Sequence, residues 1–89
     1  MSTLASENIT SHQIKFIYNL KNKFIICEWD EKVINNQIRD SAKEVDLKIK
    51  DAYLALYWLL INKNKGPKIA AIISELQRND IIKIFETVF

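Results

Sequence analysis

Three lysines gather in one short segment, Lys63-Asn64-Lys65-Gly66-Pro67-Lys68, which also contains the only glycine and the only proline of the chain. Ammonium groups bind anions, and phosphate is one of the anions that lysine binds in proteins. Pro67 suits the first position of a helix, because a helix start needs no amide hydrogen there. Gly66 would then be the N-cap, without a side chain to pair with the first helical amides.

A cation at a helix N-terminus is unfavourable unless an anion is bound there, since the helix dipole is positive at that end. We therefore predict a phosphate-binding helix start, with the candidate RNA- or phosphate-binding residues Lys63, Lys65, Gly66 and Lys68. The alternative is a solvated turn whose lysines serve solubility. Lys21 and Lys23 form a second basic pair, which fits the C-terminus of a helix better than a binding site.

The residue types give little support for a catalytic site, a metal site or a glycine-rich phosphate loop. The single histidine, His12, lies at a predicted helix start and favours a surface role, so no catalytic triad is expected. One histidine and one cysteine do not provide a metal site. A single glycine excludes a glycine-rich phosphate loop. We predict no catalytic, metal or cofactor-binding residues, and a buried, inert Cys27.

Aromatic residues offer a further possibility, because aromatic rings stack on unpaired nucleic-acid bases. Tyr53, Tyr57 and Trp58 lie along an apolar segment, however, and that spacing favours core packing. Trp29 precedes a predicted helix and fits a hydrophobic staple better than a stacking platform.

The composition limits the fold and the compartment. A chain of 89 residues with 48% apolar residues is long enough for one packed domain. One glycine and one proline are too few for a β-sandwich, so long helices are favoured. The net charge of +2 requires any RNA contact to come from local clustering. A lone cysteine and the absence of a signal-peptide pattern predict a cytoplasmic protein, and no apolar run is long enough for a membrane span.

The first two helices are predicted from capping patterns. Thr10 and Gln13 form a capping box before a helix at about residues 11–23, and Asp30 caps the next helix. The positions expected to face the core follow helical spacing: Ile14, Ile17 and Tyr18, with Leu20 or Lys21 beyond, then Ile34, Ile38, Ala42 and Val45. Residues 24–27 are either a buried connector or a continuation of the first helix.

The third helix is predicted to run to about Ile61 and to end at Asn62, which tolerates the left-handed conformation. It is apolar on nearly all sides, so we expect it to be central in a bundle or part of an interface. A fourth helix should begin at Pro67, and Asn79 should cap a fifth. The apolar positions of these two helices are Ile69, Ile72, Ile73 and Leu76, then Ile81, Ile82, Ile84, Phe85 and Val88.

These patterns together predict an all-α fold, a compact bundle of about five helices. We expect residues 10–89 to form a single domain. Residues 1–9 are polar, and we interpret them as a leader at the cut edge of a longer chain.

The residues from Tyr53 to Lys68 read Tyr-Leu-Ala-Leu-Tyr-Trp-Leu-Leu-Ile-Asn-Lys-Asn-Lys-Gly-Pro-Lys. Within about residues 37–76, this sequence resembles the C-terminal helical domain of class I lysyl-tRNA synthetases. That family has a helix of the form Phe-x-x-Leu/Ile-Tyr-x-x-Leu-Leu-Gly, a variable basic segment, and Gly-Pro-Arg or Gly-Pro-Lys before the next helix. Asn62 and Gln77 depart from the pattern, because glycine often stands at both positions.

The resemblance implies an anticodon-binding helical domain of an ATP-dependent ligase that joins lysine to its tRNA. ATP would bind in an upstream catalytic domain with a nucleotide-binding α/β fold, which this sequence does not contain. The fragment itself would bind RNA, without a cofactor and without catalytic residues. Its partners would be lysine-specific tRNA and the upstream catalytic domain, with no membrane and no DNA. Related glutamyl-tRNA synthetases have a similar helical cage at the same end.

Two other functions remain open from the residues alone. The apolar segment 52–61 and the last helix also fit a protein-interaction or dimerisation module. A helix-turn-helix DNA binder with residues 67–77 as recognition helix is less favoured. That segment offers few polar side chains for reading bases, namely Lys68, Ser74, Glu75 and Gln77.

Overall fold

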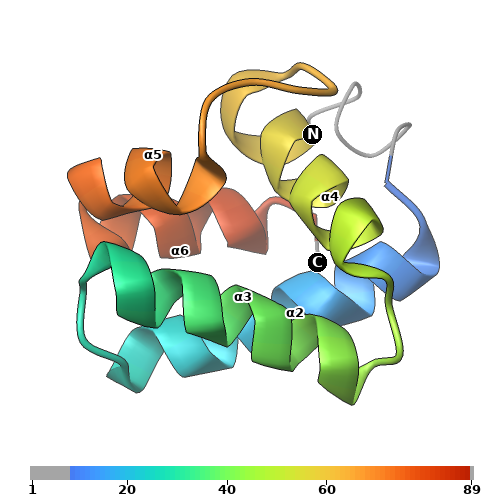
Figure 1. Cartoon of the computed structure of the whole chain (residues 1–89), viewed down its shortest axis with the longest axis horizontal. Helices are drawn as coiled ribbons and strands as arrows, with labels where there is room; N and C mark the ends of the chain where they lie inside the picture. The colour runs from blue at the N-terminus through green and yellow to red at the C-terminus, as the bar shows by residue number, and fades with distance from the viewer. Residues whose placement is uncertain (1–8, 89) are drawn as a thin grey trace.

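Five helices make up residues 9–88, the part of the chain that the computed structural model describes (Figure 1). They are α2 (Ser11–Ile26), α3 (Glu31–Glu44), α4 (Ile49–Ile61), α5 (Ile69–Glu75) and α6 (Arg78–Glu86). No strand occurs in these residues. The Cα radius of gyration is 11.5 Å, close to the ~12 Å expected for a compact domain of this size. The predicted all-α bundle is confirmed.

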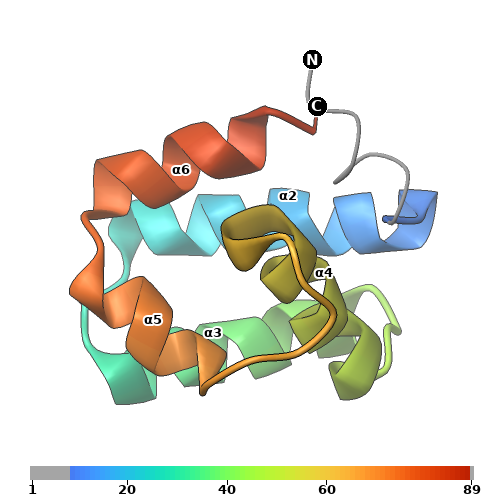
Figure 2. The ribbon, with the colours of Figure 1, turned by 90° about the horizontal axis from the view of Figure 1, so that it is seen from above.

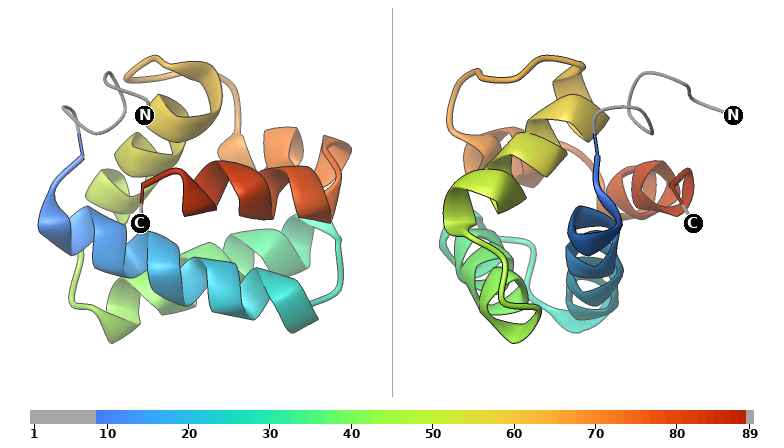
Figure 3. Two further views of the ribbon diagram at one scale, coloured as in Figure 1. Left: turned by 180° about the vertical axis from the view of Figure 1, so that it is seen from behind. Right: turned by 90° about the vertical axis from the view of Figure 1, so that its right-hand side faces the viewer.

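The helix α2 has neighbours on two sides, since α3 packs along one side and α6 along the other (Figure 2). Figure 3 shows the pair of α2 and α6 from behind, running alongside each other. The short α5 packs on α3, and α4 crosses the bundle in contact with all the other helices. The C-terminal end of α4 and the connection to α5 lie together at the top of Figure 1.

The predicted N-terminal caps of the first two helices are confirmed. The Thr10 hydroxyl accepts a hydrogen bond from the Gln13 amide at 3.1 Å, and the Gln13 side chain accepts one from the Thr10 amide at 2.8 Å. Asp30 accepts hydrogen bonds from the amides of Lys32 and Val33. These bonds satisfy amides that have no partner within the helix, and they determine where α2 and α3 begin.

The ambiguous segment after the first predicted helix continues that helix to Ile26. Phe24 is fully buried there, and its ring stacks on Phe85 of α6 with centroids 5.7 Å apart. Packing against α6 explains why α2 extends beyond its predicted end. The chain then becomes extended at Cys27, which ends the helix.

The core joins residues from all five helices of the described chain. Its fully buried members with the largest side chains are Phe16, Ile17, Leu20, Phe24, Ile34, Ile38, Leu56, Ile73, Ile81 and Phe85. The stripe predicted on the second helix is confirmed, because Ile34, Ile38 and Ala42 are buried. On α2, the assignment of Tyr18 to the core was wrong: its side chain is 51% exposed. Phe16 and Phe24 lie on the buried face instead, where they meet α6 and α3.

The third predicted helix is only partly enclosed, although it is apolar on nearly every side. Ala52, Ala55 and Leu56 are buried, Ile49 at its start is exposed, and its other hydrophobic residues are half-buried. The helix ends at Asn62, which is left-handed with φ 55° and ψ 40°, as predicted. Asp46, just after α3, also has a positive φ of 56°, a turn that the sequence patterns did not reveal.

The predicted cap of the last helix was wrong, because α6 begins at Arg78 with Gln77 as its N-cap. The Arg78 guanidinium donates a hydrogen bond to the Cys27 carbonyl at 2.5 Å, and the Leu76 carbonyl accepts one from the Trp29 indole at 2.7 Å. These long-range bonds hold the turn between α5 and α6. Gln77 has φ −79° and ψ 143°, so this turn does not require the glycine that often stands there.

Two further findings bear on the predicted boundaries. Of the predicted leader, residues 1–8 lie outside the described residues, whereas Ile9 is only 7% exposed and packs into the domain. Among residues 9–88, no helix has the length and apolar character needed to cross a bilayer.

Candidate nucleic-acid interface

The connection between α4 and α5, residues 62–68, contains all four residues predicted to bind phosphate. Every residue of this connection is exposed. It follows the apolar C-terminal turn of α4 and arches over the top of the molecule (Figure 1). The left-handed Asn62 turns the chain out of the helix, so the lysines that follow lie on the surface.

Tyr57 on α4 holds this connection in place. Its hydroxyl lies 2.7 Å from the carbonyl oxygen of Pro67 and 3.2 Å from that of Gly66, and it donates its proton to this pair. A Cβ atom on Gly66 would lie 2.7 Å from the Cδ1 atom of Ile61 and 3.5 Å from the Tyr57 ring. Glycine at this position therefore allows the backbone to approach the last turn of α4 closely.

The same contacts explain why the predicted helix start was wrong. The helix α5 begins at Ile69 with Lys68 as its N-cap, so Gly66 is not the N-cap and Pro67 is not the first helical residue. Gly66 and Pro67 are held against α4 by Tyr57, outside the axis of α5. The helix has seven residues, shorter than the predicted segment 67–77. The helix start therefore lies at Ile69, two residues later than predicted, and the Lys68 side chain does not cap it.

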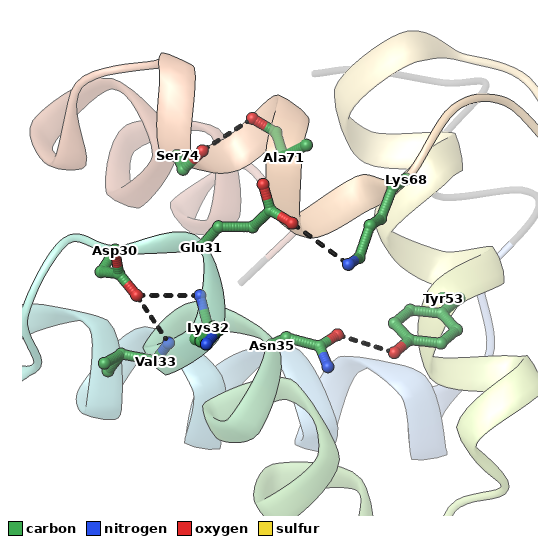
Figure 4. A network of polar contacts seen from close by, with 9 residues as sticks. All are labelled: Asp30, Glu31, Lys32, Val33, Asn35, Tyr53, Lys68, Ala71 and Ser74. Carbon is green, nitrogen blue, oxygen red and sulfur yellow. Dashed lines mark hydrogen bonds and ion pairs between the residues drawn. The ribbon is translucent and has the colours of Figure 1, made fainter.

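Lys68 forms an ion pair with Glu31, the first residue of α3. The Lys68 Nζ and Glu31 Oε2 atoms are 3.1 Å apart, with the two side chains 67% and 44% exposed (Figure 4). A pair as exposed as this contributes little to stability. It nevertheless supplies the anion that a lysine at the start of α5 needs. The ammonium group of Lys68 is thereby directed toward α3.

Beside this ion pair, Tyr53 donates a hydrogen bond to the Asn35 side chain at 2.9 Å (Figure 4). We call the group of Glu31, Asn35, Tyr53 and Lys68 the Glu31 corner. A small depression of about 170 Å³ lies here, lined by Asn35, Tyr53, Tyr57, Lys68 and Ile69. The polar groups of the Glu31 corner pair with one another, Lys68 with Glu31 and Tyr53 with Asn35. These pairs join α3 to α4 and to the start of α5.

Lys63 and Lys65 have different surroundings. Within residues 9–88, neither lysine takes part in an ion pair or a hydrogen bond. Both line an open depression of about 650 Å³ together with Trp58, Asn64 and Gly66, which we call the Trp58 depression. The structure thus places two of the three predicted lysines around one depression and the third in the Glu31 corner. The role of all four predicted residues in binding RNA stays a prediction.

The other residues singled out in the sequence have structural partners. The Nε2 atom of exposed His12 contacts the Val45 carbonyl oxygen, and Lys23 pairs with Glu44 at 2.8 Å. The ring of Trp29 packs edge-on against Phe24, with centroids 5.2 Å apart, which supports its predicted packing role. Cys27 is half-buried, and burial raises the pKa of its thiol while the Arg78 charge opposes this shift.

Metal ligands do not cluster in the part of the chain that the structure describes. No group of three or more histidine, cysteine or acidic residues lies there in a position to hold a metal ion.

Sequence reasoning missed two features of this interface. The first is the Glu31 partner of Lys68, which lies on a helix distant in sequence. The second is the position of Trp58 beside the lysines, since the apolar spacing of α4 favoured core packing. The presence of an aromatic residue one helical turn before a basic loop is the only sequence signal for this second feature.

Comparison with curated proteins finds similar segments in archaeal lysine–tRNA ligases. The ligase of Methanocaldococcus jannaschii is 30% identical over 77 residues, which cover 86% of this chain and 14% of that protein. The ligase of Picrophilus torridus is 30% identical over 74 residues, covering 83% and 14%. The ligase of Thermococcus kodakarensis is 34% identical over 65 residues, covering 65% and 12%. The predicted resemblance to lysyl-tRNA synthetases is confirmed.

The chain spans only 14% of the length of the first two of these relatives, so it resembles a domain-sized part of them. No protein-family model matches the chain. No solved structure matches it either.

Proposed function

We propose that this chain is the tRNA-binding part of a class I lysine–tRNA ligase and that it recognises the anticodon. It would stand C-terminal to a catalytic domain that uses ATP to join lysine to tRNA in the cytoplasm. The helical domain itself would bind RNA and perform no chemistry. The similarity to segments of three lysine–tRNA ligases supports this proposal.

The observation that carries the proposal is that Lys63 and Lys65 are exposed and form no ion pair within residues 9–88. Exposed lysines without a protein partner have their charge available for phosphate, and a protein with a net charge of only +2 must concentrate such charge locally. The Tyr57 hydrogen bonds hold the connection that presents them, so less order has to be gained on binding. Lys68 contributes less, because its ammonium group is already paired with Glu31.

Binding of a lysine-accepting tRNA transcript at several salt concentrations tests this proposal. The triple variant Lys63→Glu, Lys65→Glu, Lys68→Glu should bind at least about tenfold more weakly than the parent chain, with a smaller salt dependence. Its melting curve should be nearly unchanged, because all three side chains are exposed.

Three exposed lysines outside the connection provide a matched control. Lys15, Lys48 and Lys50 are also exposed and are in no ion pair within residues 9–88, and changing them to glutamate alters the net charge equally. This control should bind tRNA more tightly than the triple variant of the connection. Equal affinity of the two variants would mean that only the total charge matters, and unchanged affinity of the first would exclude the connection as the binding site.

A protein-interaction module is the second candidate, and exposed apolar side chains favour it. Tyr18, Ile25 and Ile26 on α2 are 51%, 49% and 85% exposed. Ile49 on α4 and Leu76 after α5 are also exposed, but the most exposed of these side chains, Ile26, is on α2. Sedimentation at increasing concentration tests self-association: a strict monomer would exclude dimerisation.

A further inference from the structure

The Trp58 depression is larger than an ion site. It holds about 650 Å³ and opens to solvent between the C-terminal turn of α4 and the connection that follows. The depression is broad and shallow, so a flat group such as a nucleobase can lie against it without being enclosed.

Trp58 is the aromatic residue of α4 that has no polar partner within residues 9–88. The Tyr53 hydroxyl bonds to Asn35, and the Tyr57 hydroxyl bonds to the connection. Within residues 9–88, the indole N–H of half-buried Trp58 donates no hydrogen bond. The indole N–H of Trp29 donates to the Leu76 carbonyl, whereas that of Trp58 is open to solvent or to a ligand.

The chemistry around the indole suits a nucleotide. Lys63 and Lys65 line the same depression, and neither is neutralised by a carboxylate in residues 9–88. Single-stranded nucleic acids bind where cations follow the backbone and aromatic rings stack on the bases. Phosphates and an unpaired base are adjacent in one nucleotide, as the lysines and the indole are adjacent here.

From this juxtaposition we propose that Trp58 stacks on an unpaired RNA base while Lys63 and Lys65 bind the phosphates that flank it. This inference rests on the proposed RNA-binding function and adds the residue that contacts an unpaired base, Trp58. An acidic peptide would also bind the two lysines, but its carboxylates would gain nothing from contact with the indole. Because stacking accepts every base, Trp58 gives affinity for single strands without selecting a sequence.

The two tryptophans of the chain make a direct test possible, since Trp29 lies in a different contact, against Phe24 and Arg78. In a Trp29→Phe variant, all tryptophan fluorescence comes from Trp58. A hairpin RNA with unpaired loop bases should quench this fluorescence. The same hairpin with abasic loop nucleotides keeps the phosphates and should quench far less. A Trp58→Phe variant reports Trp29 alone and should show no such difference.

Affinity gives the second readout. Trp58→Leu should bind the base-containing hairpin about tenfold more weakly than the parent and should bind the abasic hairpin equally well. A melting curve checks the fold of this variant, and the Trp29→Phe titration remains valid if Trp58→Leu does not fold. Equal quenching by both hairpins, or unchanged affinity of a folded Trp58→Leu chain, would overturn the proposal.

The outcomes also separate this inference from the function on which it rests. If tRNA binds and depends on Lys63 and Lys65 while Trp58 fluorescence does not respond, only the stacking proposal fails. If no RNA binds at all, both proposals fail. Displacement of RNA by an acidic peptide that quenches Trp58 to the same extent would indicate a protein partner instead.

Discussion

Lys63 and Lys68 belong to the same connection, yet they lie in two different environments. The Trp58 depression contains Lys63 and Lys65 with no carboxylate partner in residues 9–88, beside an indole with no internal hydrogen bond. The Glu31 corner places Lys68 against a carboxylate, next to a hydrogen bond between Tyr53 and Asn35. All three residues are lysines close together in one connection, so residue type and spacing do not distinguish the two environments. What lies opposite each ammonium group decides whether its charge remains available for a ligand.

The strongest test of this difference compares lysine variants on the two sides. Lys63→Gln with Lys65→Gln should weaken tRNA binding about tenfold and reduce the slope of log affinity against log salt by about 1.4, for two single-strand phosphate contacts. Lys68→Gln should reduce the slope by less than about 0.7. Fluorescence anisotropy over a salt series measures both slopes. A Lys68→Gln effect as large as that of the double variant would remove the distinction.

The two tyrosines of α4 provide a matched pair of smaller changes. Tyr57→Phe removes the hydrogen bond to the Gly66 and Pro67 carbonyls, so it should lower the free energy of unfolding by about 1 kcal/mol. It should also loosen the connection and weaken RNA binding severalfold, since the lysines are then less well positioned. Thermal melting and anisotropy measure the two effects. Unchanged RNA affinity would mean that the order of the connection does not contribute to binding.

Tyr53→Phe makes the same chemical change in the Glu31 corner. It removes the bond to Asn35 and should also lower the free energy of unfolding by about 1 kcal/mol, a fall in melting temperature of roughly 4–8 °C. RNA affinity should stay at the parent value, because this bond joins α3 to α4 and leaves the connection in place. A loss of affinity equal to that of Tyr57→Phe would show that the two regions act as one site.

Glu31→Gln should have the smallest effect on stability, about 0.5 kcal/mol or less, because both partners of the ion pair are largely exposed. It releases Lys68 and removes a negative charge near the interface, so tRNA should bind slightly more tightly at low salt. This gain should disappear at high salt, where charges are screened. Weaker binding by this variant would indicate that the ion pair orients Lys68 for RNA.

Much of the fold was predictable wherever the signal lies within a few neighbouring residues. The capping box at Thr10, the cap at Asp30 and the left-handed Asn62 were all confirmed, because each depends on local hydrogen bonds or a local backbone preference. The stripe of Ile34, Ile38 and Ala42 was found by periodicity alone.

The errors arose where distant residues decide the outcome. Gly66 and Pro67 have the composition of a helix start, but the Tyr57 hydroxyl holds them outside α5. Tyr18 fits an apolar stripe, yet α3 and α6 cover the Phe16 and Phe24 face of α2. For the interface, the sequence identified the lysines. It did not identify Glu31 as a partner of Lys68 or place Trp58 beside Lys63.

The sequence by itself determined that this chain forms helices, where most of them start, and that a basic connection follows its most apolar helix, because these properties depend on local spacing and residue type. Only the tertiary structure decided which ammonium groups are neutralised and which indole N–H has no hydrogen-bond partner within residues 9–88. Charge pairing and burial depend on distances between helices, and those distances follow from how the whole core packs.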